Sequence, residues 1–126
     1  WPMIGLGLDL CEIARIGAAM EKTDGFLTRY YTQEEREYLA ARGKTAAQSA
    51  AAMFAAKEAF LKALGVGLSG GISMADVGVI HDALGRPTYA LGEKARAAME
   101  ARGASTAHLS LTHDAGMAAA VCLLET

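Results

Sequence analysis

Apolar residues form strand-like runs near both ends of this chain and follow helical spacings in between. The stretch 3–10, MIGLGLDL, is a continuous apolar run and predicts a strand. Residues 12–20 carry apolar side chains three and four positions apart, which is the spacing of an amphipathic helix. A second short helix is expected around 26–30. The chain is therefore expected to begin with a strand and to continue in helices.

Two further helices are predicted from the signals at their ends. The sequence TQEE at 32–35 fits a capping box, in which the threonine and the last glutamate bond each other's backbone N–H groups. That helix is predicted over 33–42, with a glycine directly after it. The longest helix is predicted over 45–64 and is expected to be ended by Gly65 and Gly67. A glycine-rich loop is expected at 66–73.

The second half of the chain reads mainly as short strands. In order, its predicted elements are a strand at 77–80, a turn at 82–87, a strand at 88–91, a helix at 92–102, and strands at 108–112 and 117–124. The last two strands are expected to form a hairpin through the sequence HDAG. No linker or internal repeat divides the chain. The pattern predicts an α+β fold: a single small domain over 3–126, in which a mostly antiparallel sheet packs against a long helix and shorter helices. Trp1 and Pro2 precede Met3, which we interpret as the native start.

The composition fits one domain with a modest core. Of 126 residues, 52% are hydrophobic and 21% are charged, which is typical of a globular protein. Much of the apolar content is alanine, which favours helix but buries little area per residue. A core this rich in alanine is expected to gain from a partner subunit.

Charge and cysteine content narrow the function classes. The net charge of -2 argues against general nucleic-acid binding, which needs a basic surface. No apolar run approaches the ~20 residues that span a bilayer, and no basic leader precedes the first strand. Cys11 and Cys122 are too few for a disulfide framework, so we predict reduced core residues. We expect a cytoplasmic protein that binds neither nucleic acid nor membrane.

A carboxylate stands on the apolar side of the longest helix. Phe54, Glu58 and Leu61 are spaced i, i+4 and i+7, so they share a face. Lys62 follows one turn after Glu58, and one interpretation is a surface ion pair between the two. The other is a site where Glu58 binds a hard cation and Lys62 meets an anion, because a buried carboxylate needs a compensating charge.

Asp9 favours the second interpretation. It ends the first apolar run, where it either caps the following helix or emerges as a functional group at a sheet edge. Two carboxylates without matching Cys or His ligands suit Mg²⁺, which prefers oxygen ligands and keeps several waters. The glycine-rich stretch 65–71 could bring backbone amides to an anion, although it is not a Walker-type loop. His113 is either a hydrogen-bonded structural residue or part of such a site.

Four segments together resemble the small bacterial holo-acyl-carrier-protein synthases, the 4′-phosphopantetheinyl transferases of fatty-acid synthesis. They are IGLGLDLCEIARI near the start, FAAKEAFLKALGVG in the middle, GRP at the turn and LSLTHDAGMAAAVCLLE at the end. They occur in the family's order and spacing, and the resemblance covers nearly the whole chain from Met3.

This resemblance implies a reaction. A serine of an apo-acyl carrier protein attacks the β-phosphate of coenzyme A (CoA), accepts phosphopantetheine and releases adenosine 3′,5′-bisphosphate. Asp9 and Glu58 match the family's Mg²⁺ ligands. Lys62 matches the lysine that contacts phosphate, and His113 matches the histidine near the phosphoadenosine end. These four residues are therefore expected to be catalytic.

The resemblance also implies contacts with both substrates. Residues expected to bind the coenzyme are Lys44, Gly65, Gly85, Arg86, Pro87, Ser110, Thr112 and His113. Arg15 matches a residue that meets the acidic helix of the carrier protein, and Met20, Lys22 and Arg29 are neighbouring candidates. For Lys22 and Arg29 the alternative is an ordinary solvated face. The family is homotrimeric with coenzyme sites between subunits, so a homotrimer is expected.

One position departs from the family pattern. Met53 stands where the family usually has an arginine that helps to hold phosphate, so either the affinity for the 3′-phosphate is weaker here or Lys44 or Arg86 compensates. Two other functions stay open on the sequence alone. One is a CoA- or nucleotide-binding module without turnover. The other is an oligomeric scaffold in which the polar residues form structural salt bridges.

Overall fold

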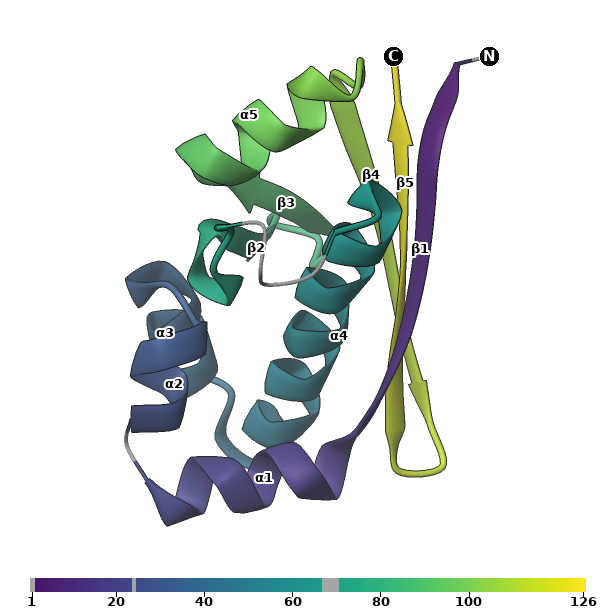
Figure 1. Cartoon of the computed structure of the whole chain (residues 1–126). Helices are drawn as coiled ribbons and strands as arrows, with labels where there is room; N and C mark the ends of the chain where they lie inside the picture. The colour runs from purple at the N-terminus through teal and green to yellow at the C-terminus, as the bar shows by residue number, and fades with distance from the viewer. Residues whose placement is uncertain (1, 24, 67–70) are drawn as a thin grey trace.

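Two antiparallel sheets and one long helix organise the chain (Figure 1). The computed structural model describes residues 2–23, 25–66 and 71–126. The elements in order are β1 (Met3–Glu12), α1 (Ile13–Lys22), α2 (Gly25–Tyr30), α3 (Gln33–Ala40), the 3-10 helix η1 (Gly43–Thr45), α4 (Ala46–Leu64), the 3-10 helix η3 (Met74–Asp76), β2 (Val77–His81), β3 (Pro87–Leu91), α5 (Glu93–Ala101), β4 (Thr106–Asp114) and β5 (Met117–Glu125). The predicted α+β class is confirmed.

The larger sheet has the strand order β1-β5-β4, and β2 pairs with β3 in a separate two-stranded sheet. The first and last strands lie side by side, with Leu8 opposite Val121. The predicted hairpin between β4 and β5 is present, and its turn residues Ala115 and Gly116 have φ of 51° and 78°. Both values are positive, as a two-residue turn of type I′ requires. Figure 1 shows α4 along one face of this sheet and α1 across the lower end of α4.

Glycines let α4 lie directly on β1. A Cβ added at Gly7 would lie 2.7 Å from the Ala63 nitrogen and 2.9 Å from the Ala59 carbonyl carbon, and Gly5 faces the Ala63 carbonyl as closely. Side chains at these strand positions would push the helix away. The alanine content of α4 therefore serves a close helix–strand approach, and this contact positions the candidate site.

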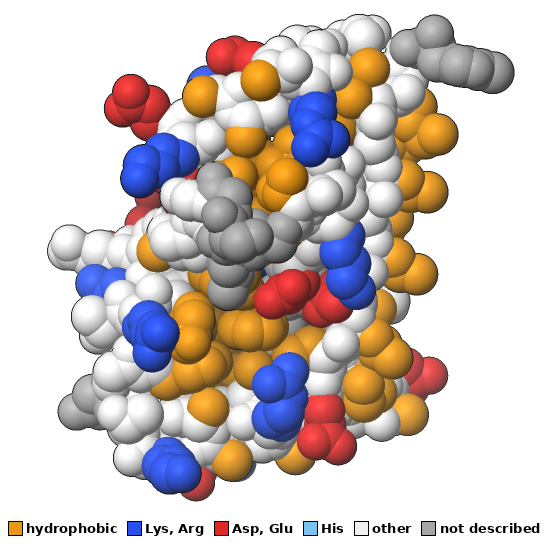
Figure 2. Space-filling view, in the orientation of Figure 1, with side chains coloured by type: hydrophobic (Ala, Val, Ile, Leu, Met, Phe, Trp, Pro, Cys, Tyr) orange, Lys and Arg blue, Asp and Glu red, His pale blue; other side chains and the backbone are white. Residues whose placement is uncertain are grey.

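The outer face of the larger sheet carries exposed apolar side chains. Leu6, Leu8 and Leu10 of β1 are 57%, 65% and 63% exposed. Figure 2 shows an apolar row along this edge of the molecule. We call the surface formed by these leucines and their cross-strand neighbours on β5 the outer sheet face. Large exposed apolar surfaces are uncommon on a protein that acts as a single chain.

Local sequence signals predicted several helix and strand ends correctly, and three predicted ends need correction. The capping box is present: Glu35 N donates to Thr32 Oγ1 at 3.0 Å, and Thr32 N donates to Glu35 Oε1 at 2.8 Å. The helix it begins ends at Ala40 rather than 42, because Gly43, with φ of 58°, starts η1 instead. Strand β1 continues to Glu12, two residues beyond the prediction.

The third correction concerns β4, which spans Thr106–Asp114 and so contains His113 rather than ending before it. Gly65 ends α4 in the left-handed conformation, as predicted. Gly67, expected to help end this helix, and the middle of the 66–73 loop lie outside the described residues. Cys11 and Cys122 are buried and free, which confirms the prediction for both thiols.

Candidate active site

Asp9 lies on the side of β1 that faces α4. Side chains alternate along the strand, so Leu8 and Leu10 point outward and Asp9 points inward. Three further strand residues follow it, so the prediction that Asp9 ends the strand is wrong. Asp9 does not cap α1 either, because the N-cap of that helix is Glu12 and makes no side-chain capping bond. The carboxylate is thus held at the strand–helix contact.

Lys62 of α4 bonds Asp9 across this contact. Its Nζ donates to Asp9 Oδ1 at 3.0 Å and to the Leu8 carbonyl oxygen at 3.1 Å. Among the described residues, the ion pair of Lys62 is with Asp9 and not with Glu58, so the surface pair that the helical spacing allowed is not formed. The close approach of β1 and α4 joins two residues that lie 53 positions apart in the sequence.

Glu58 lies beside this pair. Its side chain makes no hydrogen bond or ion pair with any residue that the structure describes. Burial raises the pKa of Glu58, and the negative charge of Asp9 raises it further. The cations Lys62 and Arg15 act on this pKa in the opposite direction. Glu58 is therefore a half-buried carboxylate whose charge is not fully compensated. We call Asp9, Glu58 and Lys62 the acidic site.

The acidic site fits a hard divalent cation. It offers oxygen ligands from two carboxylates, and a cation between them would relieve the repulsion that acts on Glu58. Within residues 2–23, 25–66 and 71–126, no cluster of three or more His, Cys, Asp or Glu that could hold a metal occurs. An ion here would take its remaining ligands from water or phosphate oxygens, as Mg²⁺ commonly does.

Aromatic and basic side chains adjoin the acidic site. Phe26, Tyr30 and Phe54 form an aromatic cluster with ring centroids 5.2 to 6.3 Å apart. The Arg15 guanidinium lies 5.9 Å from the centroid of Phe54, which is one helical turn before Glu58. Figure 2 shows this face as an apolar hollow with Lys and Arg side chains around it and acidic side chains at its upper right edge. An anionic partner would therefore meet positive charge around an apolar floor.

A pocket of about 240 Å³, lined by α3, α4, the β2–β3 turn and β4, lies apart from the aromatic cluster. We call it the α3–β4 pocket. The predicted coenzyme-binding residues that line it are Gly85, Pro87, Thr112 and His113. Gln48 Nε2 and His113 Nε2 lie 3.1 Å apart, so α4 holds the histidine ring at the pocket. The structure thus brings together residues from two distant parts of the sequence.

Three residues that sequence reasoning missed form a stack in this pocket. The rings of Tyr38 and His81 are parallel, with centroids 4.2 Å apart. The Arg42 guanidinium lies 5.3 Å from the Tyr38 centroid. The only available signal was the i, i+4 spacing of Tyr38 and Arg42, which places both on one side of a helix end.

Two polar groups of the stack, the Arg42 guanidinium and His81 Nδ1, have few or no hydrogen-bond partners among the described residues. Arg42 Nε donates to Ser49 Oγ at 3.2 Å, and no other side-chain hydrogen bond of Arg42 occurs within the described ranges. His81 Nδ1 is buried and has no hydrogen-bond partner among the described residues. Burial lowers the pKa of His81, and the Arg42 charge lowers it further. A neutral imidazole and a guanidinium therefore line one wall, which suits an aromatic ligand carrying negative charge.

Four predicted coenzyme-binding residues do not line the pocket. Lys44 is exposed in η1, Gly65 caps α4, Arg86 pairs with Asp82 at 3.5 Å, and Ser110 lies on the outer sheet face opposite Val121. Met53 is fully buried in the core. The pocket therefore has Arg42 as its lining cation rather than Lys44 or Arg86, the two that the sequence offered as replacements.

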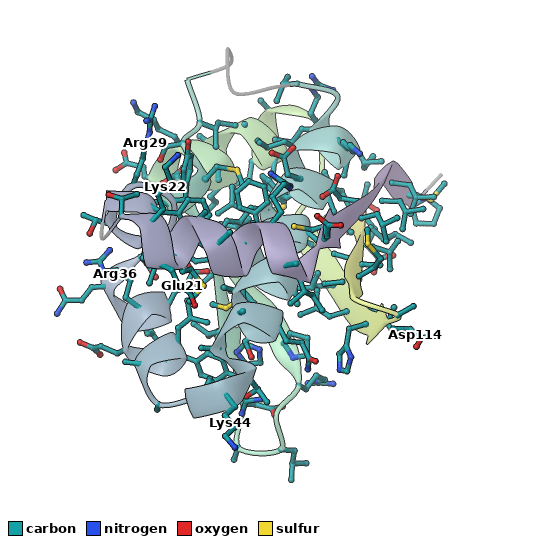
Figure 3. The ribbon with its side chains drawn as sticks, turned by 90° about the horizontal axis from the view of Figure 1, so that it is seen from below. Glu21, Lys22, Arg29, Arg36, Lys44 and Asp114 are labelled. Atoms are coloured by element: carbon teal, nitrogen blue, oxygen red, sulfur yellow. The ribbon has the colours of Figure 1, made fainter. Side chains whose placement is uncertain are left out.

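The predicted partner-binding residues lie on α1 and α2. Figure 3 places Lys22 and Arg29 on the same side of α1, and Lys44 on the opposite side. Arg29 also lines a cavity of about 380 Å³ together with Tyr30 and residues 71–74. We call it the α2–η3 cavity. Met20 lines a groove between α1, α2 and α3, away from Arg15.

Fold and sites together define a small α+β protein with an acidic, lysine-bearing site between β1 and α4 and a separate pocket lined by a cation, two features suited to a phosphorylated ligand. Comparison with known proteins agrees. The model of the 4′-phosphopantetheinyl transferase superfamily matches residues 5–122. A holo-[acyl-carrier-protein] synthase from Trichlorobacter lovleyi is 44% identical over 124 residues, covering 98% of both chains.

Solved structures agree as well. The crystal structure of the holo-[acyl-carrier-protein] synthase from Neisseria meningitidis has a TM-score of 0.89 at 34% identity and covers 98% of this chain and 99% of that one. The enzyme from Bacillus anthracis, in complex with CoA (3′,5′-ADP), has a TM-score of 0.82 at 30% identity, with 100% and 99% coverage. The chain belongs to the 4′-phosphopantetheinyl transferase superfamily. None of the helices in the described ranges combines the length and apolarity needed to cross a membrane.

Proposed function

We propose that this chain transfers 4′-phosphopantetheine from CoA to a serine of an apo-acyl carrier protein. The serine oxygen forms a bond to the β-phosphorus, and the bond from that phosphorus to the bridging oxygen breaks. Adenosine 3′,5′-bisphosphate leaves, and the serine proton passes to solvent or to a carboxylate of the site. The convergence of Asp9, Glu58 and Lys62 from β1 and α4 is the observation that carries this proposal.

Each residue of the acidic site has a role in this proposal. Asp9 and Glu58 would hold Mg²⁺, which when bound offsets the charge of the diphosphate. Lys62 pairs with Asp9, and its side chain is 55% exposed, so its ammonium group can turn toward a phosphate without leaving a buried position. Transfer between phosphate oxygens depends chiefly on positioning and charge compensation, which these three residues supply.

The two substrates are assigned to two different parts of the surface: CoA to the α3–β4 pocket, and the carrier protein to the face formed by α1 and α2. The α3–β4 pocket suits the phosphoadenosine end of CoA: its stacked rings match a purine and Arg42 matches a phosphate. His113 borders the same pocket. The carrier protein would approach on the other side, over α1 and α2, where Arg15, Lys22 and Arg29 offer positive charge to an acidic helix.

The assembly belongs to the proposal too. The outer sheet face exposes Leu6, Leu8 and Leu10 in one row, and burial of this row between copies would yield the expected homotrimer. Ser110 lies on the same face, so coenzyme contacts at the subunit boundary are compatible with its position. We place the domain at 3–126, and the location in the cytoplasm, where reduced cysteines persist.

Mass spectrometry tests the transfer directly. The protein is incubated with CoA, Mg²⁺ and a panel of apo-carrier proteins, and the carrier is examined for a phosphopantetheine arm on serine. Modification of at least one carrier is expected. If no carrier is modified while CoA raises the melting temperature, the chain is a CoA-binding module without turnover. If neither effect occurs, the polar residues serve an oligomeric scaffold.

A further inference from the structure

A fully buried ion pair includes the residue next to Glu58 on α4. Lys57, the residue before Glu58 on α4, and Glu35 of α3 both have side chains that are 0% exposed. Lys57 Nζ donates to Glu35 Oε1 at 2.7 Å and to Oε2 at 2.9 Å. The proposed transfer chemistry uses neither residue, because both are sealed from solvent.

The pair is the meeting point of four elements. Lys57 Nζ also donates to the carbonyl oxygens of Met74 at 3.1 Å and Val77 at 2.9 Å. Glu35 in turn accepts from the backbone nitrogens of Thr32 at 2.8 Å and Val79 at 2.8 Å. These bonds connect the start of α3, the middle of α4, η3 and β2. Every one of them is directional, so together they fix how these elements lie against each other.

Stability alone does not account for this pair. Replacing a buried ion pair by apolar residues of similar volume is often neutral or stabilising, because desolvation offsets the attraction. The main effect of the pair is therefore expected to be the positioning of the backbone segments that it bonds. Its backbone partners Met74 and Val77 lie on the path by which the chain returns from the end of α4.

The return path forms one wall of the α2–η3 cavity. Residues 71–74 face Arg29 and Tyr30 of α2 across about 380 Å³. Among the described residues, the side-chain hydrogen bonds that join η3 to α4 come from Lys57. The other cavity has a separate tether, because Tyr89 of β3 donates its hydroxyl to the Ala56 carbonyl oxygen of α4 at 2.6 Å. The two tethers join α4 to different elements, η3 and β2 through Lys57 and β3 through Tyr89.

We propose that Lys57, held by Glu35, is a positioning residue that sets the 71–74 wall of the α2–η3 cavity and thereby the approach of the carrier protein to Glu58. This inference rests on the proposed function. It assigns Lys57 to the carrier side of the site and Tyr89 to the coenzyme side. The predicted consequence is that loss of the buried pair raises KM for the carrier and not KM for CoA.

The test uses the double variant Glu35→Gln/Lys57→Met, which keeps the side-chain volumes and leaves no buried charge. We expect a folded protein whose KM for apo-carrier rises about tenfold, since displacements of about 1 Å around a site have effects of this order or larger. KM for CoA should change by less than about twofold on the same reasoning. Backbone amide exchange over 71–79 should be faster than in the parent protein, and this readout does not depend on turnover.

Tyr89→Phe is the matched control, because it also removes a partly buried hydrogen bond to α4. It should leave KM for the carrier and exchange over 71–79 unchanged. Unchanged exchange in a folded double variant, or an equal rise of both KM values, would overturn the inference. If the double variant does not fold, Glu35→Asp, which keeps both charges and shortens the reach to Lys57, must show the same split to a smaller degree. A parent protein that modifies no carrier refutes the proposed function, whereas the exchange measurement still decides the role of Lys57.

Discussion

Gly7 is the position at which the helix–strand contact can be tested most directly. Its strand faces α4 so closely that a methyl group would lie 2.7 Å from the Ala63 nitrogen and 2.9 Å from the Ala59 carbonyl carbon. Ordinary contacts begin near 3.4 Å. The groups in the way are helix backbone and cannot rotate aside. In Gly7→Ala, β1 must therefore move away from α4 by about 1 Å, given that overpacked cores respond by backbone shifts.

This shift has a cost in stability and a larger one in activity. Overpacking of a core costs about 1–3 kcal/mol, and a backbone obstacle favours the upper end of that range. The moved strand carries Asp9, whereas Glu58 and Lys62 stay on α4. A displacement of about 1 Å between groups that act together can lower turnover about 100-fold. The lysine–aspartate bond of 3.0 Å would lengthen by a similar amount.

Denaturant unfolding and steady-state transfer of phosphopantetheine measure the two effects. Gly17→Ala in α1 is the matched control, because the added methyl would lie 3.4 Å from Ala47 Cβ of α4, an ordinary contact. Alanine within a helix should leave stability equal or raise it by up to about 1 kcal/mol. Gly7→Ala with parental stability and parental kcat/KM would refute the claim that the close approach assembles the acidic site.

Three further predictions address the acidic site, the α3–β4 pocket and the outer sheet face. Glu58→Gln should keep the melting temperature and lose about 100-fold in Mg²⁺-dependent turnover, since one cation ligand is lost; an active variant would show that Glu58 is not a ligand. Arg42→Gln should lower kcat/KM for CoA about tenfold and leave that for 3′-dephospho-CoA unchanged if the guanidinium binds the 3′-phosphate. In the same variant, NMR titration should find the pKa of His81 raised, because the Arg42 charge helps to lower it; an unmoved titration contradicts the stack. Leu8→Glu should release single chains of 13.1 kDa in light scattering, because a charge cannot be buried in an apolar interface; an assembly of unchanged mass would place the interface elsewhere.

Local chemistry explains which parts of the fold could be predicted from the sequence. The capping box at Thr32 and Glu35 and the left-handed Gly65 involve residues within a few positions of each other, and the structure has both. The Glu58–Lys62 surface pair, which the spacing allowed as one interpretation and the structure does not form, has the same origin. Helical spacing identifies Glu58 as a neighbour, but the partner that wins is Asp9, which lies 53 positions away and is reached only when β1 docks on α4. Spacing along one element carries no information about such a contact.

The cation of the α3–β4 pocket shows this limit most clearly. In the sequence, Met53 marks a missing arginine, and the family resemblance offers Lys44 or Arg86 as its replacement. The structure buries Met53 completely, so position 53 of this chain faces the core, where a charge would need a partner. Arg42 instead reaches the pocket from the end of α3, where Tyr38 and Ser49 orient its guanidinium. His81 of β2 stacks on Tyr38 in the same pocket, and Glu35 of α3 also joins β2 by accepting a hydrogen bond from the Val79 nitrogen. The pocket cation is therefore a product of tertiary packing between α3, α4 and β2, and the i, i+4 spacing of Tyr38 and Arg42 alone could not have specified it.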